Sequence, residues 1–74
     1  MACYFFDIRD GEAFAPDEVG MILPNIESAQ EEAARSLGDL AREMVRGRPF
    51  RQVAIEVRDP NGPVLEVAWR SLRE

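Results

Sequence analysis

Acidic side chains in the first eighteen residues are the first candidates for chemistry. Five of them lie around one turn and the loop after it: Asp7, Asp10, Glu12, Asp17 and Glu18. Carboxylates suit hard cations such as Ca²⁺ or Mg²⁺. Their spacing does not match the D-x-[DN]-x-[DN]-G-x₅-E calcium loop, because Arg9 intrudes and Gly11 precedes most of the acids. We therefore predict turn-forming aspartates and a solvated acidic loop, with no metal site.

Catalytic groups are scarce in the rest of the sequence. The chain has no histidine, so it lacks the usual general base near neutral pH and the commonest transition-metal ligand. The single cysteine, Cys3, excludes an intrachain disulfide and a thiolate metal cage, and we interpret it as a small apolar strand residue. No phosphate-loop, dinucleotide, nucleophile-elbow or zinc-protease motif occurs. The sequence predicts that the protein is not an enzyme and has no catalytic residue and no cofactor.

The basic residues, all arginines, are unevenly distributed along the chain. Residues 1–34 carry one Arg against eight acids, a net charge of −7, whereas residues 35–74 carry eight against six, a net charge of +2. Four arginines gather around the end of the predicted helix and are candidate anion contacts: Arg42, Arg46, Arg48 and Arg51. The helix dipole favours cations there, and guanidinium groups suit phosphate or an acidic patch on a second chain. The net charge of −5 argues against non-specific nucleic-acid binding.

Alternating apolar residues indicate the strands that position these groups. Residues 2–9 form one predicted strand, with Tyr4, Phe6 and Ile8 on one face. A turn at Asp10-Gly11 leads to a short strand over 12–15, a loop over 16–20 and a brief extended piece over 21–23. Two more predicted strands, 52–58 and 64–70, flank the turn at 59–62.

One helix is predicted over 26–46, with Asn25 as N-cap and Gly47 at the C-terminal position that favours glycine. Ser28 and Glu31 form a capping box that would instead start the helix one turn later. The apolar arc of this helix is about 180° wide, whereas a helix that covers one sheet needs a stripe of about 100° or somewhat more.

These elements predict one α+β domain over 1–74, a small antiparallel sheet of order β-β-(β)-α-β-β with one helix packed on one face. The predicted core is Phe6, Ile8, Leu37, Leu40, Met44, Val53, Ile55, Val57, Leu65, Val67 and Trp69. Six charged side chains point away from the helix and are expected to form a solvated ladder: Asp7, Arg9, Glu56, Arg58, Glu66 and Arg70.

The apolar face of the helix is wider than the sheet requires, and the residues along its extra side are candidate partner contacts. This side consists mostly of small residues, Ala34, Gly38, Ala41 and Val45. Small side chains let another backbone approach closely, and Gly38 costs about 1 kcal/mol relative to alanine unless its missing side chain is used. The covering group is either an intrachain segment, Met21-Ile22-Leu23 or Phe14, or the same edge of a second copy. We expect the second copy, and hence a homodimer.

The first twenty-five residues carry a resemblance to a known family. The run Tyr4-Phe5-Phe6-Asp7-Ile8-Arg9-Asp10-Gly11, then Pro16-Asp17-Glu18-Val19-Gly20, Leu23-Pro24 and an Ala-Glu-rich helix resembles a family of short alphaproteobacterial proteins classed as a domain of unknown function. That family carries no assigned activity and implies no catalytic residue. A weaker likeness runs to HicB-type antitoxins, which place an Ala-Glu-rich helix after N-terminal strands.

No apolar run approaches the roughly 20 residues of a membrane span, and residues 1–9 do not resemble a signal peptide. We therefore expect a cytoplasmic bacterial protein that does not associate with a membrane. The expected role is a non-enzymatic protein-interaction or self-associating module. The alternative is a nucleic-acid-linked regulator of the antitoxin kind.

Overall fold

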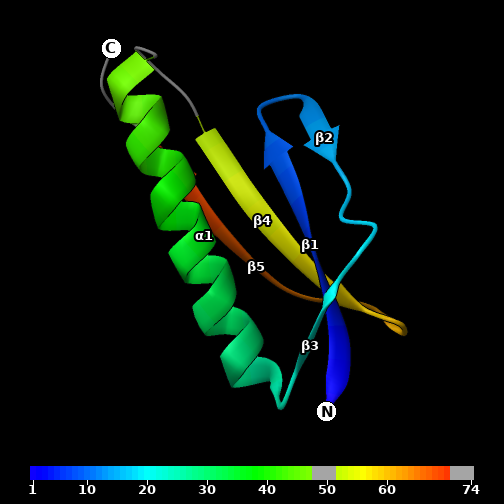
Figure 1. The fold of residues 1–74 in the computed structure, drawn as a ribbon. Coiled ribbons are helices and arrows are strands. Elements are labelled where there is room, and N and C mark those ends of the chain that lie inside the picture. Colours follow the sequence, from blue (N-terminus) through cyan, green and yellow to red (C-terminus); the bar gives the residue numbers. More distant parts are fainter. Residues whose placement is uncertain (48–51, 71–74) are drawn as a thin grey trace.

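The structure is one antiparallel sheet with a helix on one face (Figure 1). It is a computed structural model that describes the backbone of residues 1–47 and 52–70 and the side chains of residues 1–43 and 52–70. Five strands and one helix follow in the order β-β-β-α-β-β, so the α+β prediction is confirmed. The elements are β1 Ala2–Asp10, β2 Ala13–Ala15, β3 Met21–Leu23, α1 Ile26–Gly47, β4 Gln52–Asp59 and β5 Gly62–Arg70.

Strand β1 lies inside the sheet, whose order is β2-β1-β4-β5. The two short strands share the same side of β1. β2 pairs with residues 8–10 of β1, and β3 pairs with residues 2–4. Residues 5–7 of β1 therefore have no strand beside them on that side. The loop over 16–20, which joins β2 to β3, must pass this gap.

The N-terminus of α1 is fixed by Asn25, as predicted. The Asn25 Oδ1 atom accepts a hydrogen bond from Ser28 N–H at 2.9 Å, which satisfies one of the first-turn donors that have no partner within the helix. The later start at the Ser28 capping box is therefore wrong. Within the described part of the chain, no helix combines the length and the apolar character that a membrane crossing requires.

The core lies between α1 and the inner face of the sheet. Its buried members are Tyr4, Ala29, Ala33, Ile55 and Val57, and half-buried apolar residues packed on them include Phe6, Ile8, Leu37, Leu40, Leu65 and Val67. Val53 is buried as well, whereas its cross-strand partner Trp69 is only half-buried. Most of the predicted core is thus confirmed. The helix residues packed most deeply against the sheet are the alanines Ala29 and Ala33, however, and not the predicted leucines Leu37 and Leu40. The Met44 side chain lies outside the described residues.

The predicted small-residue edge of α1 does not form one surface. Ala34 and Gly38 are exposed, whereas Ala41 is 8% exposed and buried by the chain itself. The prediction of Ala41 as a partner contact is therefore corrected, and the Val45 side chain lies outside the described residues. A Cβ atom at Gly38 would meet nothing within 4 Å, so neither Met21-Ile22-Leu23 nor Phe14 covers this glycine.

The open surroundings of Gly38 predict a stabilising substitution. Gly38→Ala should raise the free energy of unfolding by about 0.5–1 kcal/mol, because alanine loses less backbone entropy in a helix and no atom obstructs its methyl group. Urea unfolding followed by circular dichroism measures the change. The reverse substitution at the neighbouring exposed position, Ala34→Gly, should lower stability by a similar amount. A destabilised Gly38→Ala variant would mean that another group packs against this glycine.

Candidate functional site

The sheet surface turned away from α1, here the outer face, carries two ion pairs between described residues, and both of them join strands. Its side chains come from alternate positions of three strands: Cys3, Phe5, Asp7 and Arg9 of β1; Ala54, Glu56 and Arg58 of β4; and Glu66, Ala68 and Arg70 of β5. Cross-strand register sets Asp7, Glu56 and Glu66 in one row and Arg9, Ala54 and Ala68 in the next. Charged side chains thus border a row in which two of three side chains are methyl groups.

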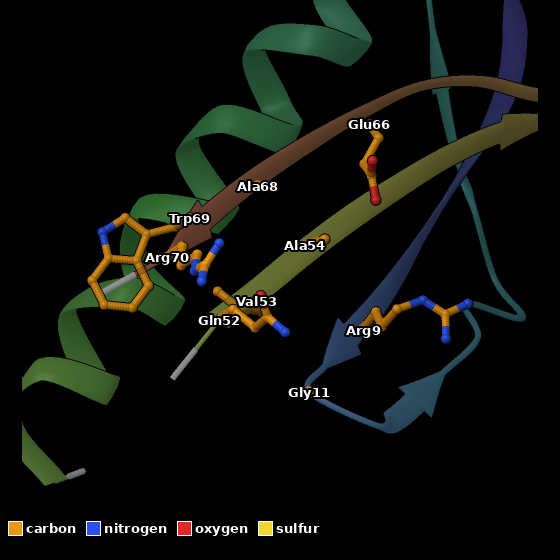
Figure 2. Close-up of a pocket in the computed structure, with 9 residues that line it drawn as sticks. All are labelled: Arg9, Gly11, Gln52, Val53, Ala54, Glu66, Ala68, Trp69 and Arg70. Carbon is orange, nitrogen blue, oxygen red and sulfur yellow. The ribbon is translucent and has the colours of Figure 1, made fainter. Parts of the chain in front are cut away.

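A shallow pocket lies on the sheet around the Ala54–Ala68 pair (Figure 2). Its volume is about 280 Å³, and its polar lining is Arg9, Gln52, Glu66 and Arg70. The small side chains of the alanines leave the depression, and the longer side chains around them form its wall. These groups offer hydrogen bonds and charge of both signs to a ligand.

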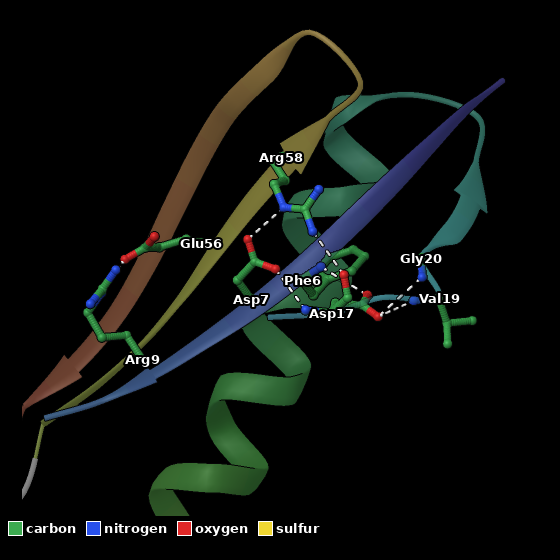
Figure 3. Close-up of polar contacts among 8 residues, drawn as sticks. All are labelled: Phe6, Asp7, Arg9, Asp17, Val19, Gly20, Glu56 and Arg58. Atoms are coloured by element: carbon green, nitrogen blue, oxygen red, sulfur yellow. Dashed lines mark hydrogen bonds and ion pairs between the residues drawn. The ribbon is translucent and has the colours of Figure 1, made fainter. Parts of the chain in front are cut away.

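Asp17 fills the gap beside β1 (Figure 3). Its Oδ2 atom accepts a hydrogen bond from Phe6 N–H at 3.1 Å, where a neighbouring strand would otherwise supply a carbonyl. Its Oδ1 atom accepts from Val19 N–H at 3.0 Å and Gly20 N–H at 3.2 Å, which folds the loop back on itself. One carboxylate therefore satisfies a strand donor and shapes the loop that crosses it.

Asp7 and Arg58 attach the same loop to the outer face. Asp7 Oδ1 accepts from Asp17 N–H at 2.8 Å, and Asp7 Oδ2 accepts from Arg58 Nε at 2.9 Å. Arg58 also donates from Nη2 to the Asp17 carbonyl oxygen at 2.9 Å, and its guanidinium lies 4.5 Å from the centroid of the Phe5 ring. Asp7 is only 5% exposed, so the prediction of a fully solvated ladder is wrong at this position. The loop covers it.

A second charge pair on the outer face is more open. Arg9 Nε donates to Glu56 Oε2 at 2.7 Å, and the Arg9 guanidinium lies 4.6 Å from the centroid of the Phe14 ring. This pair confirms the predicted cross-strand ladder at its exposed end. Glu66 and Arg70, which belong to β5, have no ion-pair partner among the described residues.

The environment of Asp17 favours its charged form. The hydrogen bond from Val19 N–H is the largest of the effects that lower the pKa of Asp17, and those from Phe6 and Gly20 act in the same direction. The positive charge of Arg58 lowers this pKa further, whereas partial burial opposes the shift. The carboxylate is therefore a structural anion, held by the donors around it.

The two edges of the sheet differ in how they end. On one edge β2 and β3 are three residues each, and the Asp17 carboxylate occupies the space between them. The other edge is β5, nine residues long, and no described strand pairs with its far side. Short strands and covering loops are common protections of a sheet edge. Among the described residues, β5 has no such cover.

The ladder pattern shows which backbone groups β5 presents. Gly11 N–H donates to the Gln52 carbonyl at 3.2 Å, so the peptide groups of Gln52, Ala54 and Glu56 face β1. Because peptide groups alternate in direction along a strand, those of Val53, Ile55 and Val57 face β5. Their partners Trp69, Val67 and Leu65 point their peptide groups back at β4. The N–H and C=O groups of Glu66, Ala68 and Arg70 consequently point to the open edge.

Of the four residues predicted as anion contacts, the structure describes the side chain of Arg42 alone, so their grouping stays a prediction. Arg42 pairs with Asp39 at 3.3 Å in an exposed contact, and the side chains of Arg46, Arg48 and Arg51 lie outside the described residues. Of the five acidic candidates, Asp7 and Asp17 meet, but they bind N–H groups and Arg58. Among residues 1–47 and 52–70, no three potential ligands are arranged to hold a metal ion.

The Asp7–Asp17–Arg58 network was missed at the level of sequence. Its residues are 10, 41 and 51 positions apart, so no local pattern links all three. The one available signal was the pair of aspartates in the resemblance motif, each followed within a few residues by a glycine.

The model of a family described as a domain of unknown function, DUF6894, matches residues 3–69. No curated protein and no solved structure matches the chain. The predicted resemblance to a domain of unknown function is confirmed, while the alphaproteobacterial origin and the antitoxin likeness stay predictions.

The lowered pKa of Asp17 predicts acid-sensitive stability. Because the folded-state pKa lies below the value of about 3.9 for an unfolded aspartate, the stability that Asp17 contributes is complete above that pH. It is lost as the pH falls through the folded-state pKa. An Asp17→Asn variant should be less stable than the parent at neutral pH, and the difference should shrink in acid. Urea unfolding across this range measures it.

The matched control is Glu18→Gln, which removes an exposed neighbouring charge. Its difference from the parent should stay small at every pH. If Asp17→Asn differed from the parent by a constant amount down to strongly acidic pH, the charge of Asp17 would not be what stabilises the loop.

Gly20 predicts a second, steric effect in this loop. Its φ is 79°, and an added Cβ would lie 2.7 Å from Cys3 Sγ and 2.9 Å from Phe5 Cε2. Gly20→Ala should therefore cost about 2–4 kcal/mol, the sum of backbone strain and overpacking. Gly11→Ala is the control, since φ there is 61° but the space around it is open, and it should cost only about 1–2 kcal/mol. Equal losses in the two variants would contradict the close packing at Gly20.

Proposed function

We propose that this chain, which belongs to the DUF6894 family of domains of unknown function, is a non-enzymatic protein-interaction module that associates with itself through β5. The observation that carries the proposal is the open edge of the sheet. An edge strand presents a row of unpaired backbone donors and acceptors, and pairing with a further strand is the most direct way to satisfy them. Glu66, Ala68 and Arg70 present such groups in register.

The contrast between the two edges supports this assignment. On the β1 side, the Asp17 carboxylate satisfies the strand donor that β2 and β3 leave uncovered, and Asp7 and Arg58 hold its loop in place. On the β5 side, the register shift near Val57/Arg58 and Pro63 disturb only the first residues of the strand. From Leu65 to Arg70 the strand is regular. A partner strand can therefore approach over that whole length.

The chemistry of the outer face supports a binding role over a catalytic one. The pocket at Ala54 and Ala68 is shallow, and its polar groups are two arginines, one glutamate and one glutamine. The two aspartates that meet are both occupied by structural hydrogen bonds. The antitoxin-like alternative gains no specific support, because charges on the outer face alternate in sign rather than forming a basic surface.

Removing one edge donor tests the proposal. The N–H of Ala68 points to the open edge, so Ala68→Pro deletes an intermolecular hydrogen bond and leaves the β4–β5 ladder intact. We expect the parent to be a dimer at high micromolar concentration by light scattering after gel filtration. The Ala68→Pro variant should be a monomer with a folded circular dichroism spectrum.

Ala68→Val is the matched control, because it changes the side chain and keeps the N–H, and it should remain dimeric. Should Ala68→Pro fail to fold, Glu66→Pro repeats the experiment at a second edge-facing N–H. A parent that is monomeric at high micromolar concentration, or a folded proline variant that dimerises like the parent, would overturn the proposal.

A further inference from the structure

We infer that the strand paired with β5 is β5 of a second copy, antiparallel and centred on Ala68, so that Glu66 lies opposite the partner's Arg70. The inference rests on the proposed edge pairing and adds its occupant and its register. It starts from Glu66 and Arg70 of β5, which form no ion pair with another described residue; Glu66 only adds to the effects that raise the pKa of Arg9, after Glu56. The other strand charges of the outer face are mostly paired within the chain, as Asp7 with Arg58 and Arg9 with Glu56.

The charges on the open edge of β5 complement those of a second β5 strand that runs antiparallel to it. Reading outward from Ala68, a negative side chain lies two residues before it and a positive one two residues after it, both on the outer face and both exposed. A twofold axis places a surface against itself. With the axis at Ala68, each Glu66 meets the partner's Arg70, and the interface gains two opposite-charge pairs.

Neighbouring registers lack this match. An axis at Glu66 sets two glutamates directly opposite each other, which is unfavourable. An axis at Val67 sets Glu66 opposite the partner's Ala68 and leaves both charges unpaired. Registers displaced by an odd number of residues bring the inner face of one copy beside the outer face of the other. The charges therefore select the register centred on Ala68.

The inner face accommodates the same register. Val67 then lies opposite the partner's Trp69, a β-branched residue beside an aromatic one, which is a favourable cross-strand pair. Both side chains are only half-buried in one copy, so each has surface left to bury. Val67 already packs on the core of its own chain, and the pairing would extend that core across the axis.

The helices leave room for a second copy. α1 packs against both β4 and β5, so its axis lies inward of the open edge by roughly half the strand spacing of about 4.8 Å. Two copies joined at normal strand spacing would hold their helix axes about 10 Å apart, close to the distance at which helices pack. The pairing therefore forms one continuous sheet with two neighbouring helices on the same face.

Charge reversal tests the register directly. Glu66→Arg leaves two arginines on each edge, and Arg70→Glu leaves two glutamates, so either variant alone should weaken its own dimer by about tenfold or more. A mixture of the two variants should form a mixed dimer with affinity near that of the parent, which native mass spectrometry identifies by its mass. Sedimentation velocity at moderate salt measures each dissociation constant.

The control is Glu12→Arg, the same change of charge at an exposed turn residue beside the opposite edge of the sheet, and it should dimerise like the parent. If both reversed variants dimerise like the parent while Ala68→Pro still abolishes the dimer, the register is wrong and the edge pairing stands. If the parent is a monomer, both inferences fail. A mixed dimer no tighter than the two variant dimers would likewise overturn the register.

Discussion

The Phe6 N–H group imposes the constraint on which the outer face depends. It lies on an interior strand, at the stretch of β1 that neither β2 nor β3 covers. A backbone donor left there without an acceptor would cost about 1–3 kcal/mol, more than the net gain from a typical hydrogen bond. The chain satisfies it with a side chain instead of a strand. Because Asp17 must reach this donor, the loop over 16–20 is held against β1, and the positions of Asp7, Gly20 and Arg58 follow from that placement.

The loop over 16–20 buries the Asp7 carboxylate, and the contacts around Asp7 stabilise its negative charge. Asp7 is almost inaccessible, so removing it from water is unfavourable unless its oxygens are bonded and its charge is balanced. Arg58 provides the opposite charge from β4, while the loop itself provides a backbone donor. Arg58 stays partly exposed over Phe5, which limits its own desolvation. The same contacts that lower the pKa of Asp17 therefore tie β2, β3 and β4 into one unit around β1.

Local patterns were enough to predict the elements but not their mutual burial. Alternation in β1 and β4, the Asn25 cap and the turn at 59–62 are short-range features, and the structure agrees with each within one or two residues. The apolar face predicted for the helix was too wide to show which of its residues face the sheet. Packing resolved this through Ala29, Ala33 and Ala41, which let α1 lie close while Leu37 and Leu40 remain partly exposed. The Asp17 network joins residues up to 51 positions apart, and spacing alone contains no sign of such a contact.

Among the described residues, one edge of the sheet is covered and the edge at β5 is open, and this difference affects which strands can pair with the domain. A small domain gains little from its own core, so burying more apolar and backbone surface against another strand is thermodynamically attractive. An open edge also invites pairing with any extended chain, and charged side chains on an edge strand discourage this by leaving unpaired charges in wrong partners. Glu66 and Arg70 can serve both purposes, since the same two charges that penalise an arbitrary strand are neutralised by one that carries them in reverse order. If β5 pairs as proposed, Glu66 and Arg70 make its edge selective, because they make most other pairings unfavourable.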